Sequence, residues 1–521
     1  MLFSKKDSRV HMIFWLGLLG IMLLRTFFFG FSYFLFLDDY NTYGIFNRRN
    51  ADIWNDIILF YGHYTWRPLA FFADAYITQW FFNSFEWVLL FYTFLHFFIV
   101  LLFYNILKKS NLNFGALGIL IISLSPLLFE SVYWIGASTR LLPAMFFSLI
   151  AIYFMLKDKY LLFAIFSFIQ TGFYEQMIVF HLAFSIAIIL INGKSKKLIL
   201  IPILASIFMA SYYFVFDFLS DGRAAGRMQF ISFSDILLHP FRVLFSAFNT
   251  LFRTNFFIHF YGLPRGFLLL NTIPYILLSL LVVIFSVFVF LNLQKEKLSL
   301  EEFYDNPITR LILGVVLIIA PLAPFFILEE IWLPARTVFA SIFGLAIFAD
   351  TLFSLLPKFL KSSVCALFIV PAFLVYIAEV NNFRLIWQVD TIVINNFLEV
   401  FEEEIFEENI ETNYNIVLLN TSYIIAPVTF SGNHRLENIT SSSWALLGGL
   451  NSTSREHTFR NVMPVQNSQT LPDWENLIFL GIDEYLNIFH LTLDGYNLYS
   501  YEHIFGVIEN NSFILNKPYI Y

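Results

Sequence analysis

Long apolar segments separated by short polar breaks constrain this chain more than any other feature. Eleven segments of 13–27 residues are almost wholly apolar. A helix needs about 20 apolar residues to cross a bilayer, so such segments predict membrane-spanning helices. The composition agrees, because the chain is 58% hydrophobic and only 13% charged, about half the charged fraction of soluble domains. The expected spans are residues 12–37, 85–107, 114–135, 138–156, 160–172, 177–192, 198–219, 267–293, 311–328, 337–356 and 363–380.

The lysines predict how these spans are oriented. Thirteen of the 14 lysines lie before the first span or in loops that share its side if every span crosses once; Lys517 is the exception. Loops rich in lysine and arginine face the cytoplasm. We therefore expect a cytoplasmic N-terminus. The first apolar run ends without a small-residue cleavage site, which favours a retained span over a cleaved signal.

The arginines are distributed differently, in or beside the loops on the opposite side. These external arginines are Arg48, Arg49, Arg67, Arg140, Arg223, Arg227, Arg242, Arg253, Arg265 and Arg336. Arginine presents a planar fork of donors that matches phosphate oxygens. A phosphate-binding role at the outer surface follows, with anchoring among lipid headgroups as the alternative for some of them.

The composition changes after about Asn381. An acidic stretch, "EEEIFEENIE", precedes short β-rich runs, which predicts a small α/β or α+β domain over residues 381–521, outside the membrane by span parity. Residues 1–380 would form the all-α membrane domain. The single cysteine, Cys365, excludes a disulfide framework and a cysteine metal site. A net charge of −7 does not favour nucleic-acid binding.

Two adjacent carboxylates stand where the first span ends, in "FLDDYNTYGIF" at 36–46. A single aspartate there would mark the water interface. A pair, Asp38 and Asp39, indicates more, because neighbouring carboxylates shift each other's pKa and one can act as a base while the other orients or binds a ligand. Adjacent helical residues point about 100° apart, which favours different roles for the two.

Other charged residues lie at the same predicted face. Arg67 stands in "YTWRPLAFF", where a headgroup anchor is the alternative; Glu130 and Arg140 flank a short connection and could instead form a structural pair. Glu175 lies between two spans, and Arg336 begins another in "LPARTVFAS". Arg223 and Arg227 are four apart in "GRAAGR", so on a helix they would share a face and could grip one phosphate. The chain has no HExxH, Walker A or GxGxxG motif.

The order of these motifs resembles that of the GT-C type membrane glycosyltransferases, most closely the branch of the tetratricopeptide-linked O-mannosyltransferases and their bacterial relatives. The resemblance covers roughly residues 10–356. Its pieces are "DDYN" at 38–41, "YTWRPL" at 64–69, "SPLLFESVYWIGASTRLLPAMFF" at 125–147, "GFYEQ" at 172–176 and "LPARTVFAS" at 333–341. The chain departs from the family at Ser125, where a histidine is expected, in "GFYEQ" for "SKE", and in having no tetratricopeptide repeats.

The resemblance implies an inverting glycosyltransferase with a GT-C-like fold. The donor would be a sugar on a polyprenyl phosphate, undecaprenyl in a bacterium, and the acceptor a hydroxyl on a glycan or protein outside the membrane. Asp38 would be the general base and Asp39 a supporting group. The lipid phosphate would bind Arg67, Arg140, Arg223, Arg227 and Arg336, supported by Glu130 and Glu175. No cofactor is predicted, and the need for a divalent metal stays open.

Two alternatives come from other classes of protein. A transporter or flippase for lipid-linked sugars would also place arginines near headgroups, but it needs polar groups deep in the membrane and access from both sides. A non-catalytic scaffold for envelope assembly is the second alternative. The richness in Phe, Ile and Asn indicates an AT-rich genome, so a bacterial plasma membrane is the expected location.

Overall fold

The computed structural model describes most of the chain. The described residues are 8–37, 39–44, 67–219, 231–232, 237–295, 298, 306–329, 331, 333–405, 415–421, 438–454, 459, 461–466, 468–474, 477–483, 485–494, 496–500, 503–509 and 511–515. Three of the predicted site residues, Asp38, Arg223 and Arg227, lie outside these ranges.

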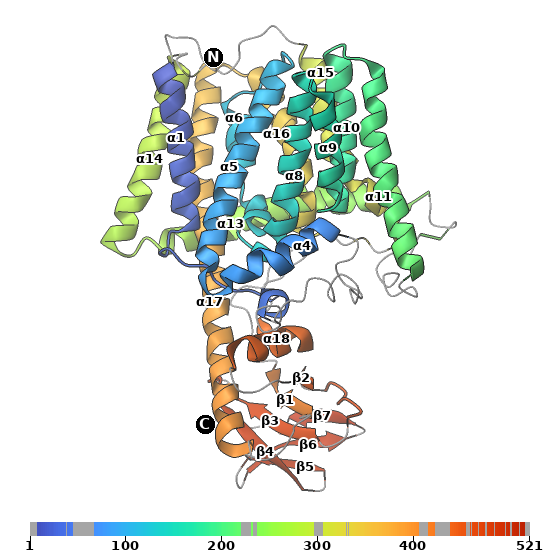
Figure 1. Cartoon of the computed structure of the whole chain (residues 1–521). Helices are drawn as coiled ribbons and strands as arrows, with labels where there is room; N and C mark the ends of the chain where they lie inside the picture. The colour runs from blue at the N-terminus through green and yellow to red at the C-terminus, as the bar shows by residue number, and fades with distance from the viewer. Residues whose placement is uncertain are drawn as a thin grey trace.

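A bundle of apolar helices forms the larger part of the molecule (Figure 1). Within the described ranges, eight helical segments are long and apolar enough to cross a membrane, and three shorter apolar ones have 10–17 residues. The longer helices are α1 (Ser8–Thr26), α5 (Phe85–Lys109), α8 (Ile135–Leu156), α11 (Leu200–Leu219), α14 (Ile273–Gln294), α15 (Pro307–Ile319), α16 (Phe339–Ser354) and α17 (Lys358–Val400). The shorter segments contain α6 (Ala116–Leu124), η3 (Pro126–Leu128), α7 (Phe129–Val132), α9 (Tyr160–Thr171) and α10 (Glu175–Ile191).

Every predicted span overlaps one of these helical segments. The prediction of a multi-pass membrane domain is therefore confirmed, whereas the number of eleven crossings stays a prediction because three of the helices are short. Short turns extend several of the helices at their ends. These turns are η2 (Thr78–Ser84), η4 (Lys196–Ile199), η7 (Ala320–Phe326) and η8 (Ala335–Val338).

The first span is shorter than the sequence predicted. Helix α1 ends at Thr26, and the chain turns at Gly30, whose φ of +109° is a conformation that glycine tolerates best. Residues 32–36 then form no regular element before the short helix η1 (Tyr40–Gly44). This irregular segment, although apolar, leads to η1, which lies beneath the bundle (Figure 1).

Several helices lie across one end of the bundle rather than along it. These are α4 (Pro68–Tyr76) and the run of α12 (His239–Phe248), η6 (Asn249–Thr254) and α13 (Asn255–Leu268) (Figure 1). The second run is amphipathic, with a stripe of exposed phenylalanines spaced as one helix face. The exposed residues are Phe241, Phe245, Phe248, Phe252, Phe256 and Phe260. Such a stripe is the pattern of a helix that lies in a membrane interface.

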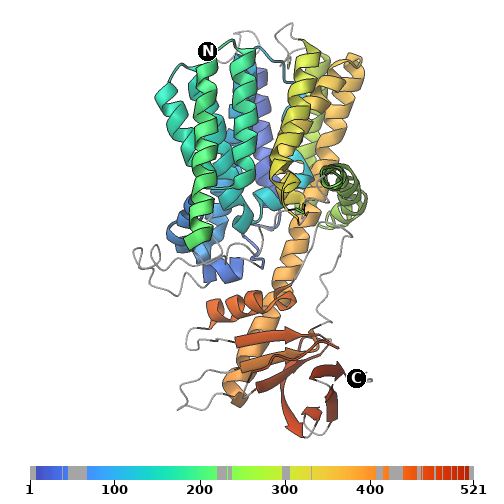
Figure 2. The ribbon, with the colours of Figure 1, turned by 90° about the vertical axis from the view of Figure 1, so that its right-hand side faces the viewer.

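Helix α17 joins the bundle to the C-terminal domain. Its 43 residues correspond to about 65 Å, roughly twice the hydrocarbon thickness of a bilayer. Only its first half lies in the bundle, and the rest runs into the C-terminal domain (Figures 1 and 2). The predicted domain boundary after residue 380 therefore falls inside one continuous helix.

The C-terminal domain is built on a seven-stranded sheet in the order β2-β1-β3-β4-β5-β6-β7. Strand β1 is parallel to both of its neighbours, and the later strands are antiparallel. The strands are β1 (Asn415–Leu419), β2 (Asn461–Val465), β3 (Leu477–Ile482), β4 (Ile488–Asp494), β5 (Asn497–Ser500), β6 (His503–Glu509) and β7 (Ser512–Leu515). A small mixed domain was expected here, and its β-rich character is confirmed.

Alternate residues of β1 face different cores. Ile416 and Leu418 belong to the apolar cluster that continues from the bundle, whereas Val417 and Leu419 belong to a separate cluster on the other face of the sheet. The first face is covered by α17 and by α18 (Ser443–Thr453), which follows the short helix η11 (Ile439–Ser441). The sheet is thus fixed to the membrane domain through its helical layer.

The two ends of the bundle differ in character (Figures 1 and 2). Helix α1 begins at the end farthest from the C-terminal domain, whereas α4, α13 and α18 all lie at the other end. Helix α4, which Arg67 precedes, and α13, which contains Arg265, therefore lie on the side of the C-terminal domain.

Candidate functional site

The N-terminus of helix α8 is capped by groups from the first loop. Asp39, which is fully buried, accepts a hydrogen bond from the Gly136 N–H at 3.1 Å through Oδ1. The Tyr33 hydroxyl accepts from the Ile135 N–H at 3.1 Å and donates to Asp39 Oδ2 at 2.5 Å. The Phe36 N–H also donates to Oδ2, at 3.0 Å. These bonds satisfy helix-end donors and place the carboxylate at the positive end of the helix.

Gly136 is the residue that permits this close approach. A Cβ atom at this position would lie 3.3 Å from Asp39 Oδ1 and 3.2 Å from the Trp134 indole nitrogen. The same tryptophan supports a cation, because the Arg336 guanidinium lies 4.7 Å from the centre of its ring. Trp134 is therefore a neighbour both of Gly136, to which Asp39 is hydrogen-bonded, and of Arg336, which is predicted to bind phosphate.

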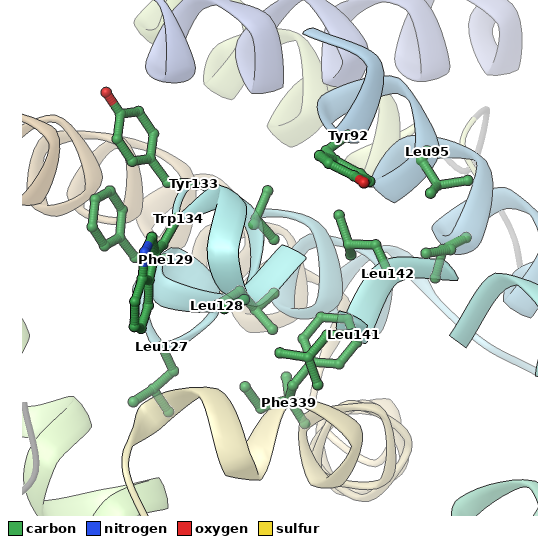
Figure 3. Close-up of a cluster of buried hydrophobic side chains, with 14 of the residues drawn as sticks. Tyr92, Leu95, Leu127, Leu128, Phe129, Tyr133, Trp134, Leu141, Leu142 and Phe339 are labelled. Atoms are coloured by element: carbon green, nitrogen blue, oxygen red, sulfur yellow. The ribbon is translucent and has the colours of Figure 1, made fainter. Parts of the chain in front are cut away.

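Arg336 reaches this position because its backbone is held as well. The Arg336 N–H donates to Glu130 Oε2 at 3.1 Å, and Glu130 is only 5% exposed. The neighbouring residues of the α7–α8 turn belong to the hydrophobic core of the bundle, part of which forms an apolar layer. Figure 3 shows Phe129, Tyr133 and Trp134 together at one edge of it, and the rings of Phe129 and Tyr133 stack with centres 5.1 Å apart. The layer fixes the α7–α8 turn on which the polar groups are mounted.

Arg67 and Glu175 form a two-pronged ion pair across 108 residues of sequence. Arg67 Nε donates to Oε2 at 2.8 Å and a terminal nitrogen donates to Oε1 at 2.5 Å. The guanidinium also lies 4.3 Å from the centre of the Tyr174 ring. This is the planar fork geometry that lysine cannot reproduce.

The start of helix α4 explains why these two residues meet. Pro68 occupies the first helical position, where its missing N–H costs nothing. The next two N–H groups, of Leu69 and Ala70, both donate to the Gly172 carbonyl, at 3.0 and 3.3 Å. Gly172 stands in the turn before α10, so this contact sets Arg67 directly beside Glu175.

Arg140 lies on helix α8 against a buried carboxylate that the sequence analysis did not select. Its guanidinium is 3.7 Å from Asp74 Oδ2, and the Tyr43 hydroxyl donates to Asp74 Oδ1 at 2.8 Å. Burial raises the pKa of the Asp74 carboxyl above its ordinary value, while Arg140 and the Tyr43 hydroxyl act in the opposite direction. An aspartate inside the apolar helix "PLAFFADAYI" was the available sign of this role.

Electrostatic interactions join these contacts into one polar cluster. The charge of Arg140 interacts electrostatically with four side chains, those of Tyr43, Asp74, Arg67 and Glu175. The Tyr174 hydroxyl interacts electrostatically with Arg67, Arg140 and Arg336. Tyr43 in turn is acted on by Asp39. Three arginines from three distant segments thus lie near Tyr174, and two of them, Arg67 and Arg140, also interact with the buried Asp74.

The structure places six of the predicted site residues in this cluster. These are Asp39, Arg67, Glu130, Arg140, Glu175 and Arg336. The other three predicted residues, Asp38, Arg223 and Arg227, lie outside the described residues. Sequence reasoning missed Asp74, although its place in an apolar helix was a sign. It also missed Tyr33, Tyr43, Trp134 and Tyr174, because tyrosine and tryptophan are common at membrane surfaces and carry no pattern of their own.

The cluster consists of three arginines and four carboxylates, with aromatic rings beside them. Within the part of the chain that the structure describes, no group of three or more His, Cys, Asp or Glu side chains is arranged to hold a metal ion. Its cations are arginines backed by aromatic rings, and its carboxylates are held by hydroxyl, backbone and guanidinium donors.

Comparison with protein-family models, with curated proteins and with solved structures finds no match to this chain.

Proposed function

We propose that the chain is an inverting glycosyltransferase that moves a sugar from a polyprenyl phosphate to an acceptor hydroxyl, on the side of the membrane that carries the C-terminal domain. The convergence of Arg67, Arg140 and Arg336 on one cluster is the observation that carries this proposal. These arginines come from three of the five motifs whose order resembles that of the GT-C enzymes. A lipid phosphate needs such donors at the membrane surface.

The proposed reaction is a single displacement. The acceptor oxygen forms a bond to the anomeric carbon, and the bond from that carbon to the phosphate oxygen breaks. The phosphate leaves with the bonding electrons, and the arginines stabilise its growing negative charge. The hydroxyl proton passes to an aspartate, for which Asp38 is the predicted base. The three donors held by Asp39 fit a supporting role, since its carboxylate already caps a helix.

The proposed topology has eleven crossings, a cytoplasmic N-terminus and an external C-terminal domain. It is supported by the arrangement of the bundle, in which α1 begins at the end opposite to that domain (Figure 1). It is also supported by the lysine distribution. A bacterial plasma membrane is the proposed location.

One observation favours the transporter alternative. Arg25 near the end of α1 is only 1% exposed and stacks on Tyr376 at 4.1 Å, and its three nitrogens have no hydrogen-bond partner among the described residues. A buried charge in a membrane helix marks a functional site by default. A flippase could use such a charge along its path, so the test must separate transfer from transport.

Reconstituted protein separates the two functions. In nanodiscs with a panel of undecaprenyl-phosphate hexoses and envelope extract as acceptor, we expect release of undecaprenyl phosphate and transfer of the hexose. Arg140→Gln should abolish both, whereas Arg253→Gln, outside the cluster, should leave them unchanged. Movement of the intact donor across proteoliposomes without phosphate release would establish transport instead. Normal turnover by Arg140→Gln would overturn the proposed site.

A further inference from the structure

A further buried carboxylate lies at the junction between the candidate site and the C-terminal domain. Asp390, on the part of α17 beyond the bundle, is fully buried. Its Oδ1 accepts a hydrogen bond from the Ile439 N–H at 2.8 Å, at the start of the helical layer of the C-terminal domain. This bond anchors η11 and, through it, the beginning of α18.

The same carboxylate faces the first loop. Tyr40, the residue after Asp39, is 3% exposed, and its hydroxyl interacts electrostatically with both Asp390 and Asp39. Neither the Tyr40 hydroxyl nor Asp390 Oδ2 has a hydrogen-bond partner among the residues that the structure describes. Two buried polar groups with unused hydrogen-bonding capacity therefore interact at this junction, and one of them, Tyr40, is next in sequence to the residue that caps α8.

The surrounding elements reinforce this junction. Helix α18 packs directly against η1, which begins at Tyr40, and both α18 and β4 pack against α17. Figure 1 shows α18 under the bundle, next to the short blue helix η1. The C-terminal domain is thus in contact with the loop that carries the predicted catalytic aspartates.

We propose that Asp390 is a positioning residue through which the C-terminal domain holds the described part of the first loop, and with it Asp39, in the geometry needed for catalysis. The catalytic part of this inference rests on the proposed function. The positional part does not, since it concerns how two parts of the chain hold each other. The site would accordingly be complete only when the C-terminal domain is docked.

Hydrogen exchange of the full chain in nanodiscs tests the positional part directly. The variants are Asp390→Ala, which removes the acceptor, and Asp390→Asn, which keeps a carbonyl for the Ile439 N–H. The matched control is Asp350→Ala, because Asp350 is also a buried aspartate on a helix and accepts the Gly115 and Gly118 N–H bonds at 2.8 and 3.1 Å.

In Asp390→Ala we expect exchange to rise at least about tenfold in two separate peptides, one covering residues 39–44 and one covering 439–453. Asp390→Asn should restore protection in both peptides, and Asp350→Ala should change neither. Increased exchange at 439–453 with unchanged exchange at 39–44 would show that Asp390 only caps its own domain, and would overturn the proposal.

A second measurement needs no destabilising variant. Burial raises the pKa of Asp390 to about 8, and the titratable side chains that act on this junction among the described residues are Tyr40 and Asp39. Exchange of the wild-type chain, corrected for the intrinsic effect of pH, should therefore increase in both peptides together between pH 6 and pH 9, and not in Asp390→Asn. An increase in only one peptide would contradict the coupling.

Turnover then tests the catalytic part. If the proposed function holds, Asp390→Ala lowers kcat for the undecaprenyl-phosphate hexose while its KM stays near the wild-type value, and Asp390→Asn restores kcat at neutral pH. Coupled exchange without any turnover in the wild type would refute the proposed function and leave the positional inference standing. Unchanged kcat in Asp390→Ala, with an active wild type, would refute the catalytic part.

Discussion

Arg67 donates two hydrogen bonds to the Glu175 carboxylate, from Nε at 2.8 Å and from a terminal nitrogen at 2.5 Å. The pair joins the first turn of α4 to the first turn of α10, which the Gly172 carbonyl also links. It is the contact by which a surface helix and a bundle helix are fixed side by side at the candidate site. Its two-pronged geometry leads to the first prediction.

Arg67→Lys should destabilise the protein, because lysine cannot make two parallel hydrogen bonds to one carboxylate. We expect a loss of about 2 kcal/mol for Arg67→Lys and for Glu175→Gln alone, and a much smaller further loss in the double variant. Thermal or chemical unfolding in detergent gives the three values. Losses that simply add would show that the two side chains do not depend on each other.

Arg336→Lys should weaken donor binding without unfolding the protein. Lysine keeps the positive charge but loses the planar stack on Trp134 and the second hydrogen-bond donor that a phosphate can use. We expect about a tenfold weaker affinity for undecaprenyl phosphate in nanodiscs. Arg253→Lys is the matched control, because Arg253 also lies near an aromatic ring, Phe257, but outside the cluster. Equal effects of the two substitutions would contradict a specific role for Arg336 and would indicate that the arginines attract the phosphate only through their overall positive charge.

The helices could be predicted from the sequence because apolar length is a local property. The predicted span 85–107 matches α5, and 138–156 lies within α8. Two boundaries failed for physical reasons. The apolar run of the first span continues past Thr26, but Gly30 takes a positive φ and the helix has already ended. Helix α17 continues past Asn381, where the apolar run ends, because its later residues pack against the C-terminal domain.

The candidate site was only partly predictable. Motif order selected Arg67, Arg140 and Arg336, and the structure brings them together. Motif order could not select Asp74 or Asp390. Each is a single aspartate in a helix, and the hydrogen-bond partner of each lies far away in sequence. Tyr43 bonds Asp74 across 31 residues, and Ile439 bonds Asp390 across 49. Such pairs follow from the packing of elements and leave no local pattern.

The topology predicts opposite labelling of two exposed positions. In a variant without Cys365, which is buried, a cysteine at Lys159 should react with a membrane-impermeant maleimide only after cells are opened. A cysteine at Asp494, exposed on the C-terminal domain, should react in intact cells. Reaction of Lys159→Cys in intact cells, with Asp494→Cys protected, would invert the scheme and place the cluster in the cytoplasm.

The buried carboxyl of Asp390 predicts a pH-dependent stability. Its pKa in the folded chain, about 8, lies above its ordinary value of 3.8, so the folded state holds a proton that the unfolded state releases. The contribution of this group is fully present below about pH 4 and is lost as pH rises towards 8. The Tm of Asp390→Asn should therefore fall less than that of the wild type between pH 5 and pH 8. Parallel curves for the two proteins would show that Asp390 is not the group responsible.

Substitution of each of the two neighbouring aspartates by asparagine is expected to have a different effect. Asp39→Asn should lower the Tm, since an amide cannot accept all of the bonds from Tyr33, Phe36 and Gly136 in the same way. Asp38→Asn, which removes the predicted base, should leave the Tm nearly unchanged.

The most direct test of the proposed function is the release of undecaprenyl phosphate from an undecaprenyl-phosphate hexose by the wild type and by Asp38→Asn. The account predicts release by the wild type and a loss of about 10²–10⁴ in rate for the variant. Turnover of Asp38→Asn and Asp39→Asn at the wild-type rate would contradict it.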